Sequence, residues 1–173
     1  MKIAIAGTHG TAKSTLANKQ FESIKSEYPD LSVGILTEVV RDCPLPINKN
    51  ATSEAQLWMF TTQLQREIEM ESEHDIIVCD RSLVDYVAYT KFIDINWATG
   101  MLEMVKKWAP TYHNIFVPSL EKYDFLEEDG VRDIKNTQWR KEIQSEIIYI
   151  LTEFTNSGIL EDDQFYIIGE DYD

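Results

Sequence analysis

The chain has 173 residues, of which 43% are hydrophobic, and its 30 acidic and 16 basic side chains give a formal net charge of −14. This length and composition predict one globular domain, residues 1–173, and argue against general disorder. The charge disfavours nucleic acid as a partner, because a nucleic-acid surface needs Lys and Arg, and no run reaches the roughly eighteen apolar residues of a membrane span.

The first apolar run, residues 2–6, is followed by a glycine-containing loop and then by a Lys-Ser-Thr sequence at residues 13–15, where a helical pattern begins. This order is typical of a phosphate-binding P-loop. Gly7 and Gly10 allow the loop N–H groups to point at a polyphosphate, and the start of the helix adds its own N–H groups. The residues predicted to bind ATP are Gly7, Thr8, His9, Gly10, Thr11, Ala12, Lys13, Ser14 and Thr15.

Two side chains of this loop have predicted chemical roles. Lys13 is placed to reach the β- and γ-phosphates, and the Ser14 hydroxyl is placed to bind Mg²⁺. The motif departs from the Gly-x4-Gly-Lys-Ser/Thr pattern at Ala12, which stands where the second glycine is expected. We expect this alanine to adopt a helical conformation, with its methyl group near the phosphates. The alternative is a strand–turn–helix that merely contains Lys-Ser, but the position directly after an apolar strand favours the P-loop.

The remaining elements follow from apolar runs and periodicity. Further strands are predicted at residues 33–36, 75–79, 115–117 and 165–168. Helices are predicted to start near residues 13 and 53, to cover residues 83–93 and 100–109, and to end near Gly158. Ser53 with Gln56 three residues later predicts a capping box. The polar residues 120–138, interrupted by Gly130, favour a mobile excursion.

Strands that alternate with helices predict an α/β fold, a five-stranded parallel sheet flanked by helices. Ligands of such sheets bind beyond the carboxyl ends of the strands. Gly7, Glu38, Asp80 and Pro118 each lie at the end of a predicted strand. We therefore expect them to converge at one edge of the sheet.

Asp80 ends the third predicted strand, which is the usual place of an acid that holds Mg²⁺. The alternative is that Asp80 caps the following helix, because Asp is a favoured N-cap residue. Arg81 is predicted to pair with a phosphate oxygen or to brace Glu38. A structural salt bridge is the other interpretation of this arginine.

Glu38 follows the second strand and is a candidate for orienting or deprotonating an acceptor. Arg41, one helical turn away, is placed to bind a negative charge on that acceptor. An ordinary exposed Glu/Arg pair is an equally good interpretation. Asp85, followed by Tyr86, is a further candidate for binding the acceptor, with a solvated helix face as the alternative.

Arg132 and Arg140 lie in or beside the polar excursion, a predicted lid at about residues 120–140. Closed over the γ-phosphate, these arginines would exclude water and stabilise the transferring charge. Arginines are also common on surface loops, so the motif alone does not decide.

Four motifs resemble those of small P-loop kinases, namely the thymidylate kinase and deoxynucleoside kinase group and the compact domains related to nicotinamide riboside kinase. They are Gly7…Lys13-Ser14, Thr37-Glu38-Val39-Val40-Arg41, Cys79-Asp80-Arg81-Ser82 and Asp129-Gly130-Val131-Arg132 with Arg140. The resemblance covers residues 1 to about 168 and implies a nucleotide-kinase-like fold with a helical lid. It also implies that Asp80 and Arg81 lie in the active site, that Glu38 handles the acceptor, and that Arg132 and Arg140 are lid arginines.

The resulting prediction is an enzyme that uses ATP and Mg²⁺ to move the γ-phosphoryl group to a nucleotide, nucleoside or related small metabolite. The nearness of Arg41 to Glu38 favours a nucleotide. The alternative is a P-loop ATPase or nucleotide-sensing module without a small-molecule acceptor.

Cys43 and Cys79 are too far apart for a short-spaced zinc motif, and no disulfide framework is indicated. The first strand begins at residue 2, so we expect no signal peptide. These features predict a cytoplasmic protein. The sequence does not decide the oligomeric state, and a homodimer stays open.

Overall fold

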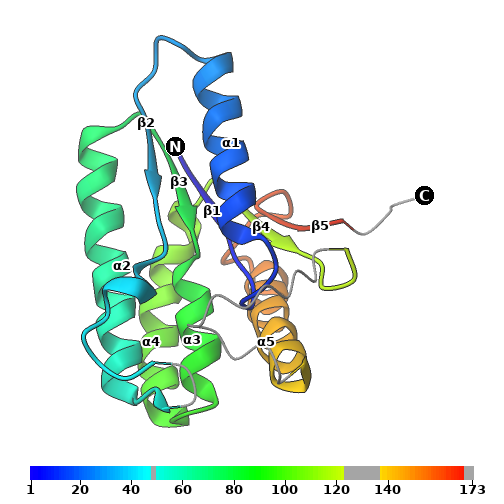
Figure 1. Cartoon of the computed structure of the whole chain (residues 1–173). Coiled ribbons are helices and arrows are strands. Elements are labelled where there is room, and N and C mark those ends of the chain that lie inside the picture. Colours follow the sequence, from blue (N-terminus) through cyan, green and yellow to red (C-terminus); the bar gives the residue numbers. More distant parts are fainter. Residues whose placement is uncertain (48–49, 123–136, 170–173) are drawn as a thin grey trace.

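The structure, a computed structural model, describes residues 1–47, 50–122 and 137–169 (Figure 1). Five strands form one sheet in the order β2-β3-β1-β4-β5, and each neighbouring pair is parallel. The strands are β1 (Lys2–Ile5), β2 (Val33–Leu36), β3 (Ile76–Asp80), β4 (Asn114–Pro118) and β5 (Phe165–Ile168). The predicted fold class is confirmed. Most of the predicted lid, residues 123–136 with Arg132, lies outside the described residues.

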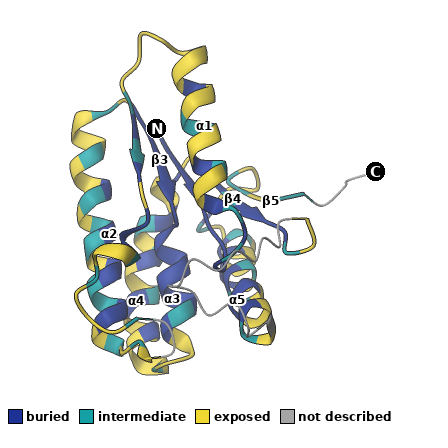
Figure 2. Cartoon of the chain, viewed as in Figure 1, coloured by how far each residue is buried: buried dark blue, intermediate teal, exposed yellow. Residues whose placement is uncertain are grey.

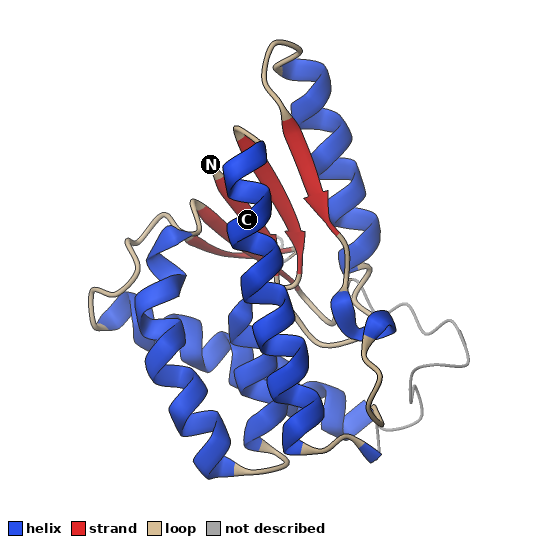
Figure 3. Ribbon diagram, turned by 90° about the vertical axis from the view of Figure 1, so that its left-hand side faces the viewer, coloured by secondary structure: helices blue, strands red, loops and turns tan. Residues whose placement is uncertain are grey.

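The helices form two unequal layers on the sheet (Figures 1 and 3). They are α1 (Lys13–Glu27), α2 (Ser53–Glu73), α3 (Leu83–Lys91), α4 (Ile95–Trp108) and α5 (Thr137–Asn156), with the short 3₁₀ helices η1 (Val39–Asp42) and η3 (Ala109–Thr111). Helix α1 covers one face, and α2 to α5 form the thicker layer on the other. Among the residues described, none of these helices combines the length and apolar character needed to cross a membrane.

Successive side chains of the central strands serve two different cores. Ile3 and Ile5 of β1 pack with Ala17 of α1, while Ala4 and Ala6 belong to the larger core under the other helices. Because a strand alternates its side chains between faces, a sheet covered on both sides needs apolar residues at every position. The central strands are accordingly buried along their length (Figure 2).

One predicted helix cap and one predicted helix start were wrong. Helix α2 is capped by Thr52, whose hydroxyl oxygen accepts a hydrogen bond from the Ala55 N–H at 3.3 Å, so the expected box of Ser53 and Gln56 does not form. Helix α4 starts at Ile95 instead of residue 100, because the Asp94 carboxylate accepts hydrogen bonds from the first turn. The apolar residues of that first turn are largely exposed, so periodicity did not mark the start.

The register of the sheet brings the strand ends together. Ile5 of β1 lies opposite Asp80 of β3 and opposite Phe116 of β4, and Leu36 of β2 lies opposite Cys79. The loops that follow these strands therefore start at nearly the same level. The thicker helical layer extends beyond this edge and forms one side of the region where the loops meet (Figures 1 and 3).

Candidate active site

The loop after β1 has the backbone turns that a P-loop needs. Gly7 has a φ of +140° and Gly10 a φ of +74°. A Cβ atom on Gly7 would lie 3.2 Å from Gln144 Oε1 and 3.4 Å from Thr11 Oγ1, so the position has neither the conformation nor the space for a side chain. Ala12 has a φ of +55° and a ψ of 22°, which is left-handed. The expectation of an ordinary helical alanine was wrong, because this residue makes the turn that glycine usually makes.

The first half of the loop is held by side chains from two helices. The N–H groups of residues 7–9 donate in turn to Asp85 Oδ1 at 2.9 Å, to Gln144 Oε1 at 2.8 Å and to the Tyr89 hydroxyl at 3.0 Å. Asp85 and Tyr89 belong to α3, and Gln144 belongs to α5. These bonds orient the loop entry without using the N–H groups that follow.

The second half of the loop keeps its donors for a ligand. In the described part of the chain, the N–H groups of residues 12–15 donate to no protein acceptor, and the first helical bond runs from the Leu16 N–H to the Ala12 carbonyl. Free N–H groups at a helix start, together with the positive end of the helix dipole, favour binding of a phosphate. The geometry therefore fits the predicted phosphate site.

Lys13 lies inside the loop, where its Nζ donates to the Thr8 carbonyl oxygen at 2.6 Å. The side chain is almost fully buried. Burial first, and then the nearby Arg81 guanidinium, lower the pKa of Lys13 to about 8, although the carboxylates around it act in the opposite direction. A buried ammonium group in this place is stabilised when phosphate charge arrives beside it.

Ser14 and Asp80 meet at the predicted Mg²⁺ position. Ser14 Oγ donates to Asp80 Oδ2 at 2.5 Å, and the other carboxylate oxygen, Oδ1, is buried and has no hydrogen-bond partner among the described residues. Burial raises the pKa of this carboxyl group. An unpartnered carboxylate oxygen beside a hydroxyl is a donor set that suits Mg²⁺, which uses few protein ligands and takes the rest from water and phosphate.

Asp80 is not the cap of the following helix. Ser82 is the N-cap residue of α3, and it forms a capping box with Asp85. The structure contains no cluster of three or more His, Cys, Asp or Glu side chains suited to a metal ion within the ranges it describes.

Arg81 holds Glu38 in a buried ion pair. Its Nε and Nη2 lie 2.7 and 2.5 Å from Glu38 Oε1, and both side chains are more than nine-tenths buried. Burial alone would lower the pKa of the guanidinium, but the Glu38 charge, together with the neighbouring Tyr89, Asp85 and Tyr86, raises that pKa well above its usual value. Of the interpretations of Arg81, bracing of Glu38 agrees with the geometry, and Glu38 is no exposed surface residue.

Asp85 is fully buried, so a solvated helix face was the wrong alternative for it and for Tyr86. Its carboxylate accepts hydrogen bonds from the Ser82 N–H and hydroxyl at 2.9 and 2.8 Å, as well as from the Gly7 N–H, and lies 3.4 Å from an Arg81 nitrogen. Asp85 therefore ties the P-loop to the turn after β3.

Arg41 is exposed on η1, three residues after Glu38.

Arg140 enters the site from the first turns of α5. Its Nε donates to the His9 carbonyl at 3.0 Å and its Nη2 to the Gly10 carbonyl at 3.3 Å, and the side chain is 1% exposed. Arg140 thus binds the P-loop through two of its backbone carbonyl groups. The predicted partner arginine, Arg132, lies outside the described residues.

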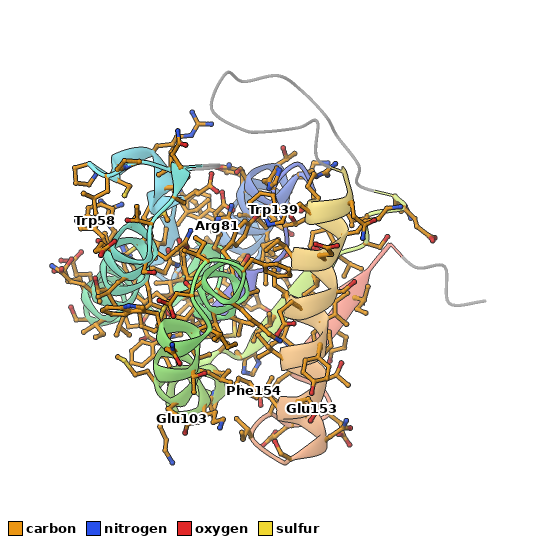
Figure 4. All side chains as sticks on the ribbon, turned by 90° about the horizontal axis from the view of Figure 1, so that it is seen from below. Trp58, Arg81, Glu103, Trp139, Glu153 and Phe154 are labelled. Carbon is orange, nitrogen blue, oxygen red and sulfur yellow. The ribbon has the colours of Figure 1, made fainter. Side chains whose placement is uncertain are left out.

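Sequence reasoning missed Tyr89 and Gln144, which both hold the P-loop. Gln144 also donates to the Pro118 carbonyl at 2.9 Å, so it joins the end of β4 to the loop. Trp139 (labelled in Figure 4) packs against two residues of this region: its ring centre lies 5.5 Å from that of His9 and 5.6 Å from that of Tyr89. The signal for Gln144 was its spacing of four residues from Arg140, which places both on one face of α5.

The left-handed backbone of Ala12 generates a stability prediction. Ala12→Gly should raise the free energy of unfolding by about 0.5–1 kcal/mol. The left-handed conformation costs an L-residue about 1–2 kcal/mol, which glycine avoids, but glycine also makes the unfolded chain more flexible, and this offsets part of the gain. Ala17→Gly, inside α1, should lower stability instead. Urea unfolding of both variants tests this, and a loss of stability in Ala12→Gly would contradict it.

The buried charge of Lys13 generates a pH prediction. In Lys13→Met the penalty for burying the ammonium is gone, so the ligand-free variant should be more stable than the wild type at pH 7, by about 3 kcal/mol. It should also lose ATP binding, because the positive charge among the phosphates is missing. Urea unfolding and calorimetric titration with ATP measure the two effects.

The sign of the pH dependence follows from the lowered pKa of Lys13. Below pH 8 the lysine is charged in both states, and the folded state bears the full cost. Between about 8 and 10.5 the folded chain gives up its proton first, so the stability of the wild type rises toward that of the variant. Lys19→Met, on the exposed face of α1, serves as the control, and a stability difference that stays constant over this pH range would contradict the assignment.

Comparisons with known proteins agree with this geometry. The family described as an AAA domain matches residues 2–161. Among solved structures, the chain is similar to a NadR protein in complex with NR, with a TM-score of 0.72 and 18% identity over 100% of this chain and 46% of that one. The chain thus spans less than half the length of the NadR structure. A comparison with curated proteins gives no match.

Two kinases are similar over nearly their whole length. A thymidylate kinase from Ehrlichia chaffeensis has a TM-score of 0.66 and 14% identity, covering 98% of this chain and 92% of its own. A deoxyadenosine kinase from M. mycoides, with dCMP and dCDP bound, has a TM-score of 0.59 and 17% identity, covering 97% and 89%. These likenesses show the fold of small P-loop kinases. The chain belongs to the AAA-domain family that its residues 2–161 match.

Proposed function

We propose that this protein is an ATP-dependent phosphotransferase that moves the γ-phosphoryl group to a nucleotide, nucleoside or related small metabolite. The observation that carries the proposal is the buried pair of Glu38 and Arg81 beside the P-loop. A module that only senses nucleotide has no need of a second oriented carboxylate across from the phosphates. The pair thus supplies an acceptor half to a site whose other half suits MgATP.

In the proposed reaction, the N–H groups of residues 12–15 and Lys13 bind the β- and γ-phosphates. Ser14 and Asp80 would hold Mg²⁺, which supplies neutralisation of the phosphate charge when bound. An acceptor oxygen forms a bond to the γ-phosphorus while the bond from that phosphorus to the β–γ bridging oxygen breaks, and ADP leaves. A hydroxyl acceptor gives its proton to Glu38, and Arg81 keeps that carboxylate in place.

Other predicted residues have roles in positioning. Asp85, tied to the P-loop and to the start of α3, would hold the donor and acceptor halves at a fixed distance. Arg140 would fix the loop through its carbonyl groups and, with Arg132, remains a candidate for binding the γ-phosphate. The proposal keeps residues 1–173 as one domain with a lid at about 120–140.

Two observations bear on the acceptor class. One similar structure is named a thymidylate kinase and another a deoxyadenosine kinase, so their names include both a nucleotide and a nucleoside. The exposed Arg41 near Glu38 favours an acceptor that already carries a phosphate, because the guanidinium would neutralise the approaching dianion. A P-loop ATPase without an acceptor is the alternative function.

Two variants separate these acceptor classes. If the acceptor is a hydroxyl, Glu38→Gln should lower turnover by about 10² or more, since the amide keeps the shape but accepts no proton. If the acceptor is a phosphate, that loss should be small, and Arg41→Ala should mainly raise the KM for the acceptor. Steady-state rates with a panel of nucleosides and nucleoside monophosphates measure both.

Arg66→Ala is the matched control, because it removes a partly exposed arginine of α2 whose partner is Asp42 of η1. It should leave the acceptor KM unchanged. We expect the result for a phosphate acceptor, namely a small loss of turnover in Glu38→Gln and a raised acceptor KM in Arg41→Ala. A large loss of turnover in Glu38→Gln, with a nearly normal acceptor KM in Arg41→Ala, would overturn that choice. If no acceptor in the panel is phosphorylated while ATP is still hydrolysed, the ATPase alternative replaces the kinase.

A further inference from the structure

Arg81 has an unusual backbone that the proposed chemistry requires. Its φ is +96°, in a region that residues other than glycine rarely adopt, and the residue is more than nine-tenths buried. The turn sends the guanidinium toward Glu38 while the main chain continues into α3. Such a conformation costs of order 1–3 kcal/mol and persists only where neighbouring groups impose it.

The peptide groups on both sides of Arg81 are held. Its N–H donates to the Ile5 carbonyl at 3.1 Å, which continues the pairing of β3 with β1. Its carbonyl oxygen accepts a hydrogen bond from Gln63 Nε2 of α2 at 3.3 Å. Without that donor, the buried carbonyl would lose its partner, and the peptide after Arg81 could rotate out of the strained turn.

The amide of Gln63 has one usable orientation. Its nitrogen lies between two acceptors, the Arg81 carbonyl and Glu67 Oε1 at 3.0 Å, while its oxygen lies 3.5 Å from the Tyr86 hydroxyl. An amide oxygen facing the two acceptors would be repelled. Gln63 is completely buried, so no alternative partner in solvent competes.

Glu67 in turn is fixed from its other side. Its carboxylate accepts hydrogen bonds from Trp108 Nε1 and from the Tyr112 hydroxyl, both at 2.8 Å, and lies 3.1 Å from Lys2 Nζ. These groups lie at the opposite end of the network from the Glu38–Arg81 pair, and Gln63 links them to the Arg81 carbonyl. The Tyr112 hydroxyl also accepts a hydrogen bond from the Leu83 N–H at 3.1 Å, two residues after Arg81. A chain of buried hydrogen bonds therefore runs from Glu67 through the Gln63 amide to the Arg81 carbonyl.

We propose that Gln63 is a positioning residue, which keeps Arg81 in its left-handed turn and thereby presents the Glu38–Arg81 pair to the acceptor. This inference rests on the proposed function for its kinetic consequence, but its structural part concerns the ligand-free protein. Gln63 touches no reacting atom and acts through Arg81.

The test compares Gln63→Met, which fills the same space without an amide, with Trp108→Phe. The control variant also removes one hydrogen bond from Glu67 but leaves Gln63 and Arg81 joined. Gln63→Met should lower kcat by about 10- to 100-fold with little change in the KM for ATP, because the acceptor half is misplaced. Trp108→Phe should stay within about twofold of the wild type, since it lies outside this contact.

A double-mutant cycle asks whether the effect passes through Arg81. In the background of Arg81→Ala, adding Gln63→Met should cost no further activity. Independent losses that multiply would contradict the positioning role. If Gln63→Met fails to fold, Gln63→Asn, whose side chain is one methylene shorter, should also lower kcat, but by a smaller factor.

A measurement without activity separates this inference from the proposed function. The Nε–H signal of Arg81 in a ¹H–¹⁵N spectrum of the ligand-free protein, assigned by its loss in Arg81→Lys, should exchange slowly because it is bonded to Glu38. In Gln63→Met it should shift and exchange faster, and in Trp108→Phe it should not change. An unchanged signal in Gln63→Met overturns the inference, even if the wild type proves to be a kinase. A shifted signal supports it even if no acceptor is found.

Discussion

The parallel pairing of β1 with β3, with Ile5 opposite Asp80, is the constraint on which the rest of the site depends. It places the P-loop and the turn after β3 at the same level of the sheet edge. Ser14 can then reach the Asp80 carboxylate, and Asp85 can reach back to the Gly7 N–H. A shift of one residue would reverse every side chain of the strand, burying the site residues on the wrong face. The two apolar cores therefore also maintain the geometry of the candidate site.

This edge concentrates features that oppose stability. Ala12 and Arg81 adopt left-handed turns, Lys13 is buried with a pKa of about 8, and Asp80 keeps a buried oxygen without a partner. Strain and buried charge persist where the surrounding structure over-determines them, and they often mark functional sites. Here the restraint comes from α3 and α5, whose side chains accept hydrogen bonds from the N–H groups at the loop entry. In the proposed MgATP site, bound phosphate and metal would relieve these charges.

The fold, and the convergence of the candidate site residues at one edge of the sheet, could be predicted because they follow local rules. Continuous apolar runs marked the strands, and the carboxyl-edge rule brought Glu38 near Asp80 without any alignment. The left-handed turn of Ala12 could not be predicted in this way, since the same alanine fits an ordinary helix start. Gln63 and Gln144 were missed because periodicity marks apolar faces, and a buried amide on such a face is visible only once its distant partner is placed. The start of α4 was missed because its first apolar residues are exposed.

The central claim is that this sheet edge joins a MgATP site to an acceptor site. The most direct measurement is the fate of the γ-phosphate, followed by ³¹P NMR with Mg²⁺, ATP and the acceptor panel in turn. The account predicts that one acceptor accelerates ADP formation and that each ADP is matched by one phosphorylated acceptor. Formation of ADP with inorganic phosphate alone, at a rate that no acceptor changes, would contradict it.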